Sequence, residues 1–237
     1  MTLGIIGGMG PLATAMMFER IIDMTDAPKD QDHMEILIMN CPWIADRTAY
    51  IMGESEENPC PQIIGVGRRL KEAGADILAM PCVTSHYFAD EIAEKTGLPL
   101  VNMPRETARY LKTRGIRRAG IMATDGTLKG GVFRKALMAE GIGLIEPDEA
   151  RQRDVMDIIY RQVKAGHPAD MEQFYRVKEY LLSQGAEAVI LGCTEYEVVK
   201  ARNNVGRGCI SALDVLCASC VQRCGYPLKA LYWDLMT

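Results

Sequence analysis

Two cysteines end matching segments in the two halves of the chain. Residues 74–82 read GADILAMPC, and residues 185–193 read GAEAVILGC. In both, Gly-Ala and an acid precede a short apolar run, and the cysteine follows at the same distance from the glycine. Such a run between turn residues predicts a buried strand, and open α/β sheets bind ligands at the carboxyl ends of their strands. One pocket with Cys82 and Cys193 on opposite walls suits a reaction that takes a proton from one face of a carbon and returns one to the other.

A free cysteine alone is often only a small buried hydrophobic residue. The repeat, with a threonine within two residues of each cysteine, favours catalysis instead. A strand end that leads into a helix also favours the thiolate. In contrast, Cys217, Cys220 and Cys224 share one predicted helix face and lack a nearby fourth ligand, so their spacing indicates core packing rather than a metal site.

The glycine-rich segment 8–13 (GMGPLA) follows the first predicted strand. It formally matches a dinucleotide fingerprint, which is weak alone. Asn40 stands where the confirming acid would be, and Pro11 makes the turn unusual. Two interpretations remain open: the backbone N–H groups bind a small anion such as a carboxylate, or the turn binds nothing.

Several polar side chains lie close to predicted strand ends. Arg47 is either a surface charge or a bidentate carboxylate clamp, at the start of an irregular loop over 47–62 that would suit a lid. Lys164 near a helix end has the default role of complementing the helix dipole. Thr124 and Thr127 follow a strand end, where their hydroxyls could meet a substrate carboxylate.

Strand and helix patterns alternate along the chain, which predicts βαβ units with parallel sheets. We expect a first α/β domain over 1–103 plus the segment from about 210 to 237, and a second over 104–209, with a junction in 103–113. The predicted strands are 3–7, 35–40, 77–80, 98–101, 119–123, 143–145, 188–191 and one from 210. The predicted helices are 11–24, 63–73, 85–95, 133–139, 154–164, 171–183 and 213–224.

The composition excludes several classes of protein. The 237 residues are 48% hydrophobic with a net charge of −4 and no block of like charges, so a nucleic-acid partner is not expected. No secretory signal or membrane-length apolar run is evident. Eight cysteines in such a chain favour reduced thiols, and we expect a cytoplasmic protein with no membrane partner. No signature for pyridoxal phosphate, a P-loop or a metal stands out, so we expect no cofactor.

Taken together, the motifs resemble the aspartate/glutamate racemase superfamily, and most closely its aspartate racemase branch. The resemblance rests on segments that run in order along most of the chain: GIIGGMGPLAT (4–14), DRTAYI (46–51), ENP (57–59), Pro-Cys-x-Thr-x-His (81–86) and GCTE (192–195).

The resemblance implies two Rossmann-like α/β domains related by pseudo-twofold symmetry, with the active site in the cleft between them. It implies cofactor-independent racemisation of an amino-acid dicarboxylate, usually in a homodimer, with Cys82 and Cys193 as the acid/base pair. It places Arg47 and Lys164 at the substrate's side-chain carboxylate. The further substrate contacts it implies are Met9, Gly10, Val83, Thr84, Thr124, Thr127, Thr194 and Glu195.

This chain also departs from the family pattern. Val83 replaces the Asn of the usual Cys-Asn-Thr pattern. Val215 and Leu216 replace the two threonines of a more polar Asp-Thr-Thr pattern. These changes make the site less polar. The alternatives are therefore a superfamily enzyme acting on another amino acid or carbon acid, and a non-catalytic dicarboxylate-binding protein. A thiol redox protein is disfavoured because neither cysteine lies in C-x-x-C, and a dinucleotide enzyme is a distant alternative.

Overall fold

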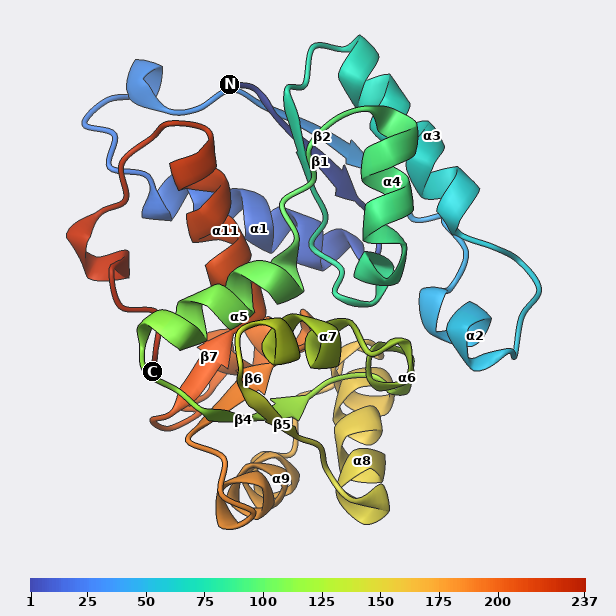
Figure 1. Cartoon of the computed structure of the whole chain (residues 1–237), viewed down its shortest axis with the longest axis vertical. Helices are drawn as coiled ribbons and strands as arrows, with labels where there is room; N and C mark the ends of the chain where they lie inside the picture. The colour runs from blue at the N-terminus through green and yellow to red at the C-terminus, as the bar shows by residue number, and fades with distance from the viewer.

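The chain folds into two parallel β-sheets surrounded by helices (Figure 1). The structure is a computed structural model that describes all 237 residues. The first sheet has the strand order β2-β1-β3, and the second has the order β5-β4-β6-β7. The strands are β1 (Leu3–Gly7), β2 (Ile36–Asn40), β3 (Ile77–Ala79), β4 (Arg118–Met122), β5 (Gly143–Ile145), β6 (Ala188–Leu191) and β7 (Cys209–Ser211).

The two sheets repeat one plan. In the first, β1 pairs with β2 on one side and with β3 on the other. In the second, β4 pairs in the same way with β5 and β6, and all of these pairs are parallel. The α/β class with two similar parallel sheets is therefore confirmed. The cysteine that ends each repeat follows the third strand of its sheet, so the topology gives both thiols the same place.

The helices pack around and between the sheets. They are α1 (Pro11–Met24), α2 (Arg47–Met52), α3 (Cys60–Glu72), α4 (Ala89–Thr96), α5 (Met103–Thr113), α6 (Asp125–Gly130), α7 (Val132–Ala139), α8 (Glu149–Met156), α9 (Met171–Ser183), α10 (Glu195–Arg202) and α11 (Ala212–Arg223). The short 3-10 helices are η1 (Asp30–Asp32), η2 (Thr84–Phe88) and η4 (Ala230–Tyr232), and η3 (Asp157–Val163) is a π-helix.

The largest apolar core is shared by both halves. It joins residues of β1 and β4 with α1, α5, α7 and α11, and Figure 1 shows α5 and α11 between the two sheets. Two smaller clusters lie under α3 in the first half and under α8 and α9 in the second. Cys217, Cys220 and Cys224 are buried in the shared core, which confirms their expected packing role.

Four local predictions were wrong. The expected loop over 47–62 contains α2, because the Asp46 carboxylate caps the helix at the Ala49 N–H and Gly53 ends it in the left-handed region (φ 81°). The expected strand over 98–101 is a single bridge from Leu100 to Leu78. The helix over 85–95 begins as the 3-10 helix η2, and the one over 154–164 is α8 followed by the π-helix η3. The helix α5, which occupies the segment 103–113 expected as the junction, and the short helices α6 and α10 were not foreseen.

The C-terminal segment connects the two halves. β7 pairs with β6 in the second sheet, whereas α11 packs against α1 and α5. Beyond α11, Leu228 forms a bridge with Thr25, and Met236 forms one with Ile210. The proposed division into 1–103 plus about 210–237 and 104–209 stays a prediction. No helix of the structure has both the length and the apolar character needed to cross a membrane.

Candidate active site

The carboxyl ends of the two sheets meet at one small pocket. The first half lines it with Met9, Asp46, Arg47, Thr48, Cys82, Val83 and Thr84. The second half lines it with Thr124, Tyr160, Lys164, Cys193, Thr194 and Glu195. The open space is about 20 Å³, which is on the order of one water molecule. The pocket is thus closed, and an amino acid can enter only after the walls separate.

A wider vestibule of about 450 Å³ adjoins this pocket on the side of the glycine turn. Arg47, Lys164 and Glu195 line both spaces. Gly8 and Gly10 line only the vestibule. Charged side chains therefore stand at the point where a ligand would pass from the vestibule to the thiols.

Each thiol follows a strand end and precedes a helical turn. Cys82 follows β3 and is buried, at 7% exposure, and Val83 begins the turn of η2. Cys193 follows β6, is partly exposed, and precedes α10. His86 Nδ1 lies 2.9 Å from the carbonyl oxygen of Cys82, and its Nε2 accepts the Met103 N–H at 3.1 Å. Burial lowers the pKa of His86 to about 4, so this neutral ring fixes the Cys82 backbone.

Cys193 is hydrogen-bonded to a carboxylate. Its Sγ donates to Oε2 of Glu195 at 2.7 Å, and the other oxygen, Oε1, lies 3.8 Å from Nζ of Lys164. Burial, and then the charge of Glu195, raise the pKa of the Cys193 thiol well above its usual value, against the opposing charge of Lys164. The ammonium of Lys164 also lies 4.4 Å from the ring centre of Tyr160.

Two nitrogens of the Arg47 guanidinium bind backbone carbonyls, and the third nitrogen has no partner. Nη1 donates to the carbonyls of Ile44 (3.2 Å) and Ala45 (2.9 Å), and Nη2 donates to that of Met9 (3.2 Å). Nε is buried and has no partner. Burial by itself lowers the pKa of Arg47, but the charges of Cys82 and Asp46 outweigh it, so the pKa is raised. A buried donor without an acceptor is uncommon, and here it can serve a carboxylate or a thiolate.

Three threonine hydroxyls form a closed ring across the two halves. Thr84 lies 3.2 Å from Thr124 and 2.9 Å from Thr127, and the last two are 3.0 Å apart. All three side chains are buried. The ring satisfies polar groups that would otherwise be costly to bury, and a substrate carboxylate could accept the same hydroxyl hydrogens once the ring opens.

The glycine turn is shaped by close backbone approach. Gly8 has φ 93°, and a Cβ placed there would lie 2.3 Å from the backbone nitrogen of Cys41, so only glycine fits. Thr14 stabilises the turn by accepting the Gly8 N–H at 2.9 Å. The turn delivers Met9 to the pocket and Gly10 to the vestibule.

Helix α2 closes the pocket by packing on α6 of the other half. A Cβ on Gly126 would come 2.8 Å from Cα of Thr48, so the two backbones nearly touch. Lys129 adds a bond of 3.0 Å to the carbonyl of Met52 at the end of α2. The segment expected as a lid thus lies over the pocket as a short helix.

The structure brings most of the predicted site residues together. Ten of them line the closed pocket; Gly10 lies in the vestibule, and Thr127 joins through the hydroxyl ring. The sequence reasoning missed Tyr160, whose signal was its position four residues before Lys164 on the same predicted helix. The π-helix η3 carries Tyr160, and Lys164 follows directly.

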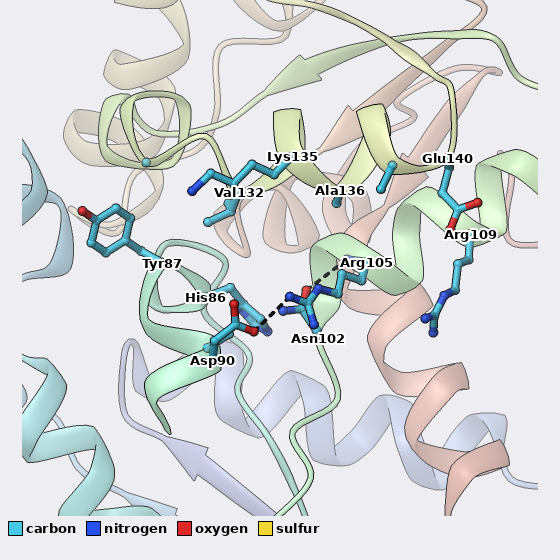
Figure 2. Close-up of a pocket in the computed structure, with 13 residues that line it drawn as sticks. His86, Tyr87, Asp90, Asn102, Arg105, Arg109, Val132, Lys135, Ala136 and Glu140 are labelled. Atoms are coloured by element: carbon cyan, nitrogen blue, oxygen red, sulfur yellow. Dashed lines mark hydrogen bonds and ion pairs between the residues drawn. The ribbon is translucent and has the colours of Figure 1, made fainter. Parts of the chain in front are cut away.

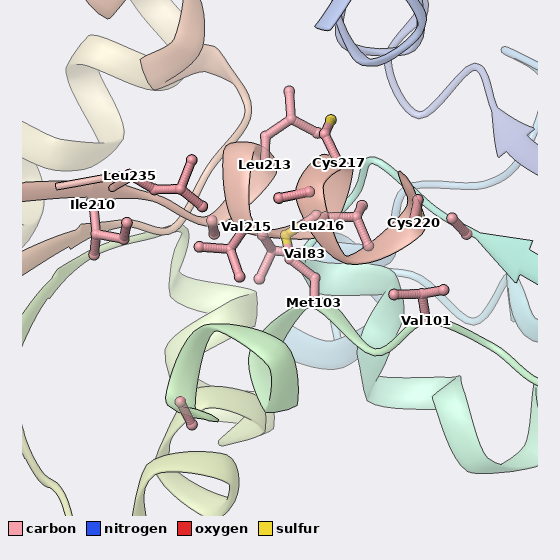
Figure 3. Close-up of a cluster of buried hydrophobic side chains, with 14 of the residues drawn as sticks. Val83, Val101, Met103, Ile210, Leu213, Val215, Leu216, Cys217, Cys220 and Leu235 are labelled. Carbon is pink, nitrogen blue, oxygen red and sulfur yellow. The ribbon is translucent and has the colours of Figure 1, made fainter. Parts of the chain in front are cut away.

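Val83 occupies an apolar place. It lines the pocket and also belongs to the shared core. Figure 3 shows it near Met103, Val215 and Leu216. The departures from the family pattern at 83 and at 215–216 therefore fall in one cluster, where each apolar side chain suits the others.

A separate groove of about 310 Å³ lies between α4, α5 and α7 (Figure 2). Its side chains include Tyr87, Arg105, Lys135 and Glu140, and His86 forms part of its wall. Arg105 is paired there with Asp90 at 2.9 Å. The groove contains neither thiol.

The two similar parallel sheets form an α/β fold that solved racemase structures share. Residues 6–220 match the family described as Asp/Glu/Hydantoin racemase, and the chain belongs to this family. The resemblance inferred from the sequence motifs is confirmed.

Individual relatives cover most of the chain. The structure of an aspartate racemase from Picrophilus torridus is 30% identical, with 98% of this chain and 97% of that chain covered and a TM-score of 0.81. The broad specificity amino-acid racemase RacX of Bacillus subtilis is 26% identical over 203 residues, which are 83% of this chain and 86% of RacX. A glutamate racemase from Francisella tularensis in complex with D-glutamate shares the fold at 14% identity, with coverages of 94% and 80% and a TM-score of 0.64.

Proposed function

We propose that this chain is a cofactor-independent racemase that interconverts L- and D-aspartate, with Cys82 and Cys193 as the two acid/base residues. The observation that carries the proposal is the meeting of the two repeat cysteines in one closed pocket. They come from equivalent strand ends of two sheets with the same topology, so they can approach a bound carbon from different sides.

In the proposed reaction, a thiolate removes the Cα proton and the opposite thiol protonates the other face. The difficulty is acidity, because a cysteine with a reference pKa of about 8.5 is a weak base for such a proton. Hydrogen bonds to the substrate's α-carboxylate stabilise the developing charge, and the hydroxyls of Thr84, Thr124 and Thr127 are suited to donate them. Closure of α2 would exclude water and align the thiols with Cα.

The preference for a dicarboxylate rests on two cations. The free Nε of Arg47 and the ammonium of Lys164 lie beside the thiols and can hold the side-chain carboxylate. Glu195 already pairs with Lys164, so the substrate competes with it. Aspartate suits this small pocket better than the longer glutamate.

The test is proton exchange. Pure protein is incubated with L-aspartate, and separately with L-glutamate, in D2O without added cofactor, while NMR follows the Cα–H signal and polarimetry follows the optical activity. We expect loss of both signals, faster with aspartate. Binding without exchange would overturn the proposal in favour of a dicarboxylate-binding protein.

A racemase of broader specificity is the second candidate. Val83 presents an apolar wall to the pocket, and Glu195 offsets the charge of Lys164, so an amino acid with an uncharged side chain also fits. Similarity to RacX supports this candidate. The same exchange assay with L-alanine and L-leucine separates the two, because faster exchange with either of these than with aspartate favours broad specificity.

We also propose a homodimer. The outer face of α1 exposes Leu12 (58%), Phe18 (40%) and Ile22 (39%), and β2 is an edge strand. Exposed apolar residues grouped on one face are typical of an interface. Analytical ultracentrifugation measures the mass, and a monomer at all concentrations would contradict this proposal.

A further inference from the structure

The two thiols of the pocket have opposite electrostatic surroundings. The guanidinium of Arg47 stands beside Cys82, whereas the carboxylate of Glu195 accepts a hydrogen bond from Cys193 at 2.7 Å. A positive neighbour favours a thiolate, and a carboxylate that accepts the S–H hydrogen favours the thiol.

The Arg47 side is built to hold an anion. Three of its contacts are backbone carbonyls, which fix the guanidinium in place. Its Nε remains buried without an acceptor. The neighbouring acid, Asp46, is exposed, and one of its carboxylate oxygens accepts the Ala49 N–H as a helix cap. The Cys82 sulfur is therefore a group in the pocket that the unpartnered Nε of Arg47 can serve when no substrate is bound.

The Glu195 side is built to keep a proton on sulfur. Oε2 accepts from Cys193, and Oε1 faces Lys164 at 3.8 Å, so each carboxylate oxygen has its own partner. The other groups near this thiol are Tyr160 and the buried Tyr196, both neutral because burial raises their pKa values. Lys164 interacts with both thiols and more strongly with Cys193, but its ammonium is already paired with Oε1 of Glu195, and at Cys193 the charge of Glu195 outweighs that of Lys164.

We infer that the resting enzyme is polarised, with its single thiolate on Cys82, held by Arg47, and its transferable proton on Cys193, held by Glu195. The inference rests on the proposed function and deepens it by assigning the starting base and acid. Arg47 and Glu195 act here as positioning residues that set the charge of the thiols.

The proton balance of one turnover follows from this assignment. The Cys82 thiolate takes the Cα proton and becomes a thiol, while the C–H electron pair stays on the substrate. The Cys193 S–H bond then breaks, its proton forms the new Cα–H bond on the opposite face, and Cys193 is left as a thiolate beside Lys164. The resting state returns when Cys82 releases a proton to solvent and Cys193 takes one up.

The rate of alkylation shows whether ionisation or solvent access decides which thiol reacts first. Because Cys193 is partly exposed and Cys82 is buried, access alone predicts that Cys193 reacts first. Only the thiolate reacts quickly, so we expect iodoacetamide at neutral pH to label Cys82 first. Peptide mass spectrometry at successive times measures both rates in the full-length protein.

Two variants complete the test. Glu195→Gln removes the carboxylate charge and so lowers the pKa of the Cys193 thiol, which should raise its labelling about tenfold, with Cys82 labelled as before. The matched control is Glu149→Gln, which removes an equal charge from an exposed place on α8 and leaves both rates unchanged. Unchanged labelling of Cys82 in Glu195→Gln also shows that the pocket is intact.

Labelling of Cys193 first, equal rates, or no response to Glu195→Gln would each overturn the inference. The racemisation assay on the same preparation keeps the two proposals apart. If Cα–H exchanges but Cys193 is labelled before Cys82, the proposed racemase function stands and the assignment of the thiolate to Cys82 is wrong. If Cys82 is labelled first but no amino acid exchanges its Cα–H, the assignment of the thiolate stands and the proposed racemase function is wrong.

Discussion

The ammonium of Lys164 lies 4.4 Å from the centre of the Tyr160 ring, and both residues line the pocket of the two thiols. The π-helix η3 ends at Val163, directly before Lys164. π-helical turns inside helices occur often at functional sites. This one places an aromatic face under the cation that would meet the substrate.

Tyr160→Leu is expected to weaken substrate binding through Lys164. A cation over an aromatic face is worth about 0.5–2 kcal/mol, so KM for aspartate should rise about two- to thirtyfold. Tyr160→Phe keeps the ring and should change KM little. Steady-state racemisation assays of the two variants measure this difference. Equal KM values would show that the Tyr160 ring does not support substrate binding through Lys164.

Replacement of either cysteine by serine is expected to reduce racemisation by at least about a hundredfold, because general acid–base groups contribute factors of that order. Cys82→Ser and Cys193→Ser should unfold at nearly the wild-type temperature. Cys220→Ser is a control cysteine in the core, which should lower stability but keep catalysis. Full turnover by Cys82→Ser or Cys193→Ser would exclude the two-base mechanism.

Val83→Asn tests the apolar cluster. The amide would be placed among the apolar side chains of Val215 and Leu216, and a buried polar group left without a partner costs about 1–3 kcal/mol. We expect a lower free energy of unfolding in urea titrations. Adding Val215→Thr supplies a hydroxyl and should restore part of the loss. A single variant as stable as the wild type would show that the amide finds its own partner in the pocket.

Gly126→Ala tests closure by α2. The added Cβ would stand 2.8 Å from Cα of Thr48, so α2 must move away from α6. Misplacement by about 1 Å can cost on the order of a hundredfold in rate, and kcat should fall accordingly. Gly65→Ala in α3 is the control, since its added Cβ meets nothing within 4 Å. Equal kcat values would show that α2 is not needed for catalysis.

Titration of Glu197 should make the free energy of unfolding depend on pH. This buried acid on α10 accepts from Ser211 and lies near Asp214, which pairs with Arg20 and Lys200. Burial, and then the charge of Asp214, raise its pKa to about 7. A raised carboxyl pKa means that the folded state holds a proton that the unfolded state has lost, so stability falls as pH rises from about 4.5 to about 7.

Glu197→Gln keeps an oxygen for Ser211 and has no proton to lose. We expect its unfolding free energy to vary less over that range and to exceed that of the wild type at about pH 8. Thermal unfolding of both proteins at matched pH measures the difference. Parallel curves would show that Glu197 does not titrate in this window.

The sequence by itself determined the repeated strands and the place of the two thiols. Apolar runs bounded by glycine and acid are local signals, and their duplication places Cys82 and Cys193 at equivalent strand ends. The glycine turn at 8–10 was likewise visible from the glycine-rich segment after the first strand, and the structure explains Gly8 by its close approach to the Cys41 backbone. Motif order along most of the chain was enough to identify the family.

The tertiary structure alone decided how the thiols are surrounded. Glu195 is only two residues from Cys193, but whether its carboxylate meets a substrate or the sulfur depends on its side-chain conformation and on Lys164, which comes from another segment. The same holds for Val83, whose neighbours Val215 and Leu216 come from the distant end of the sequence. Local periodicity reports which face of an element is buried, whereas electrostatic and packing partners are set only when remote segments pack together.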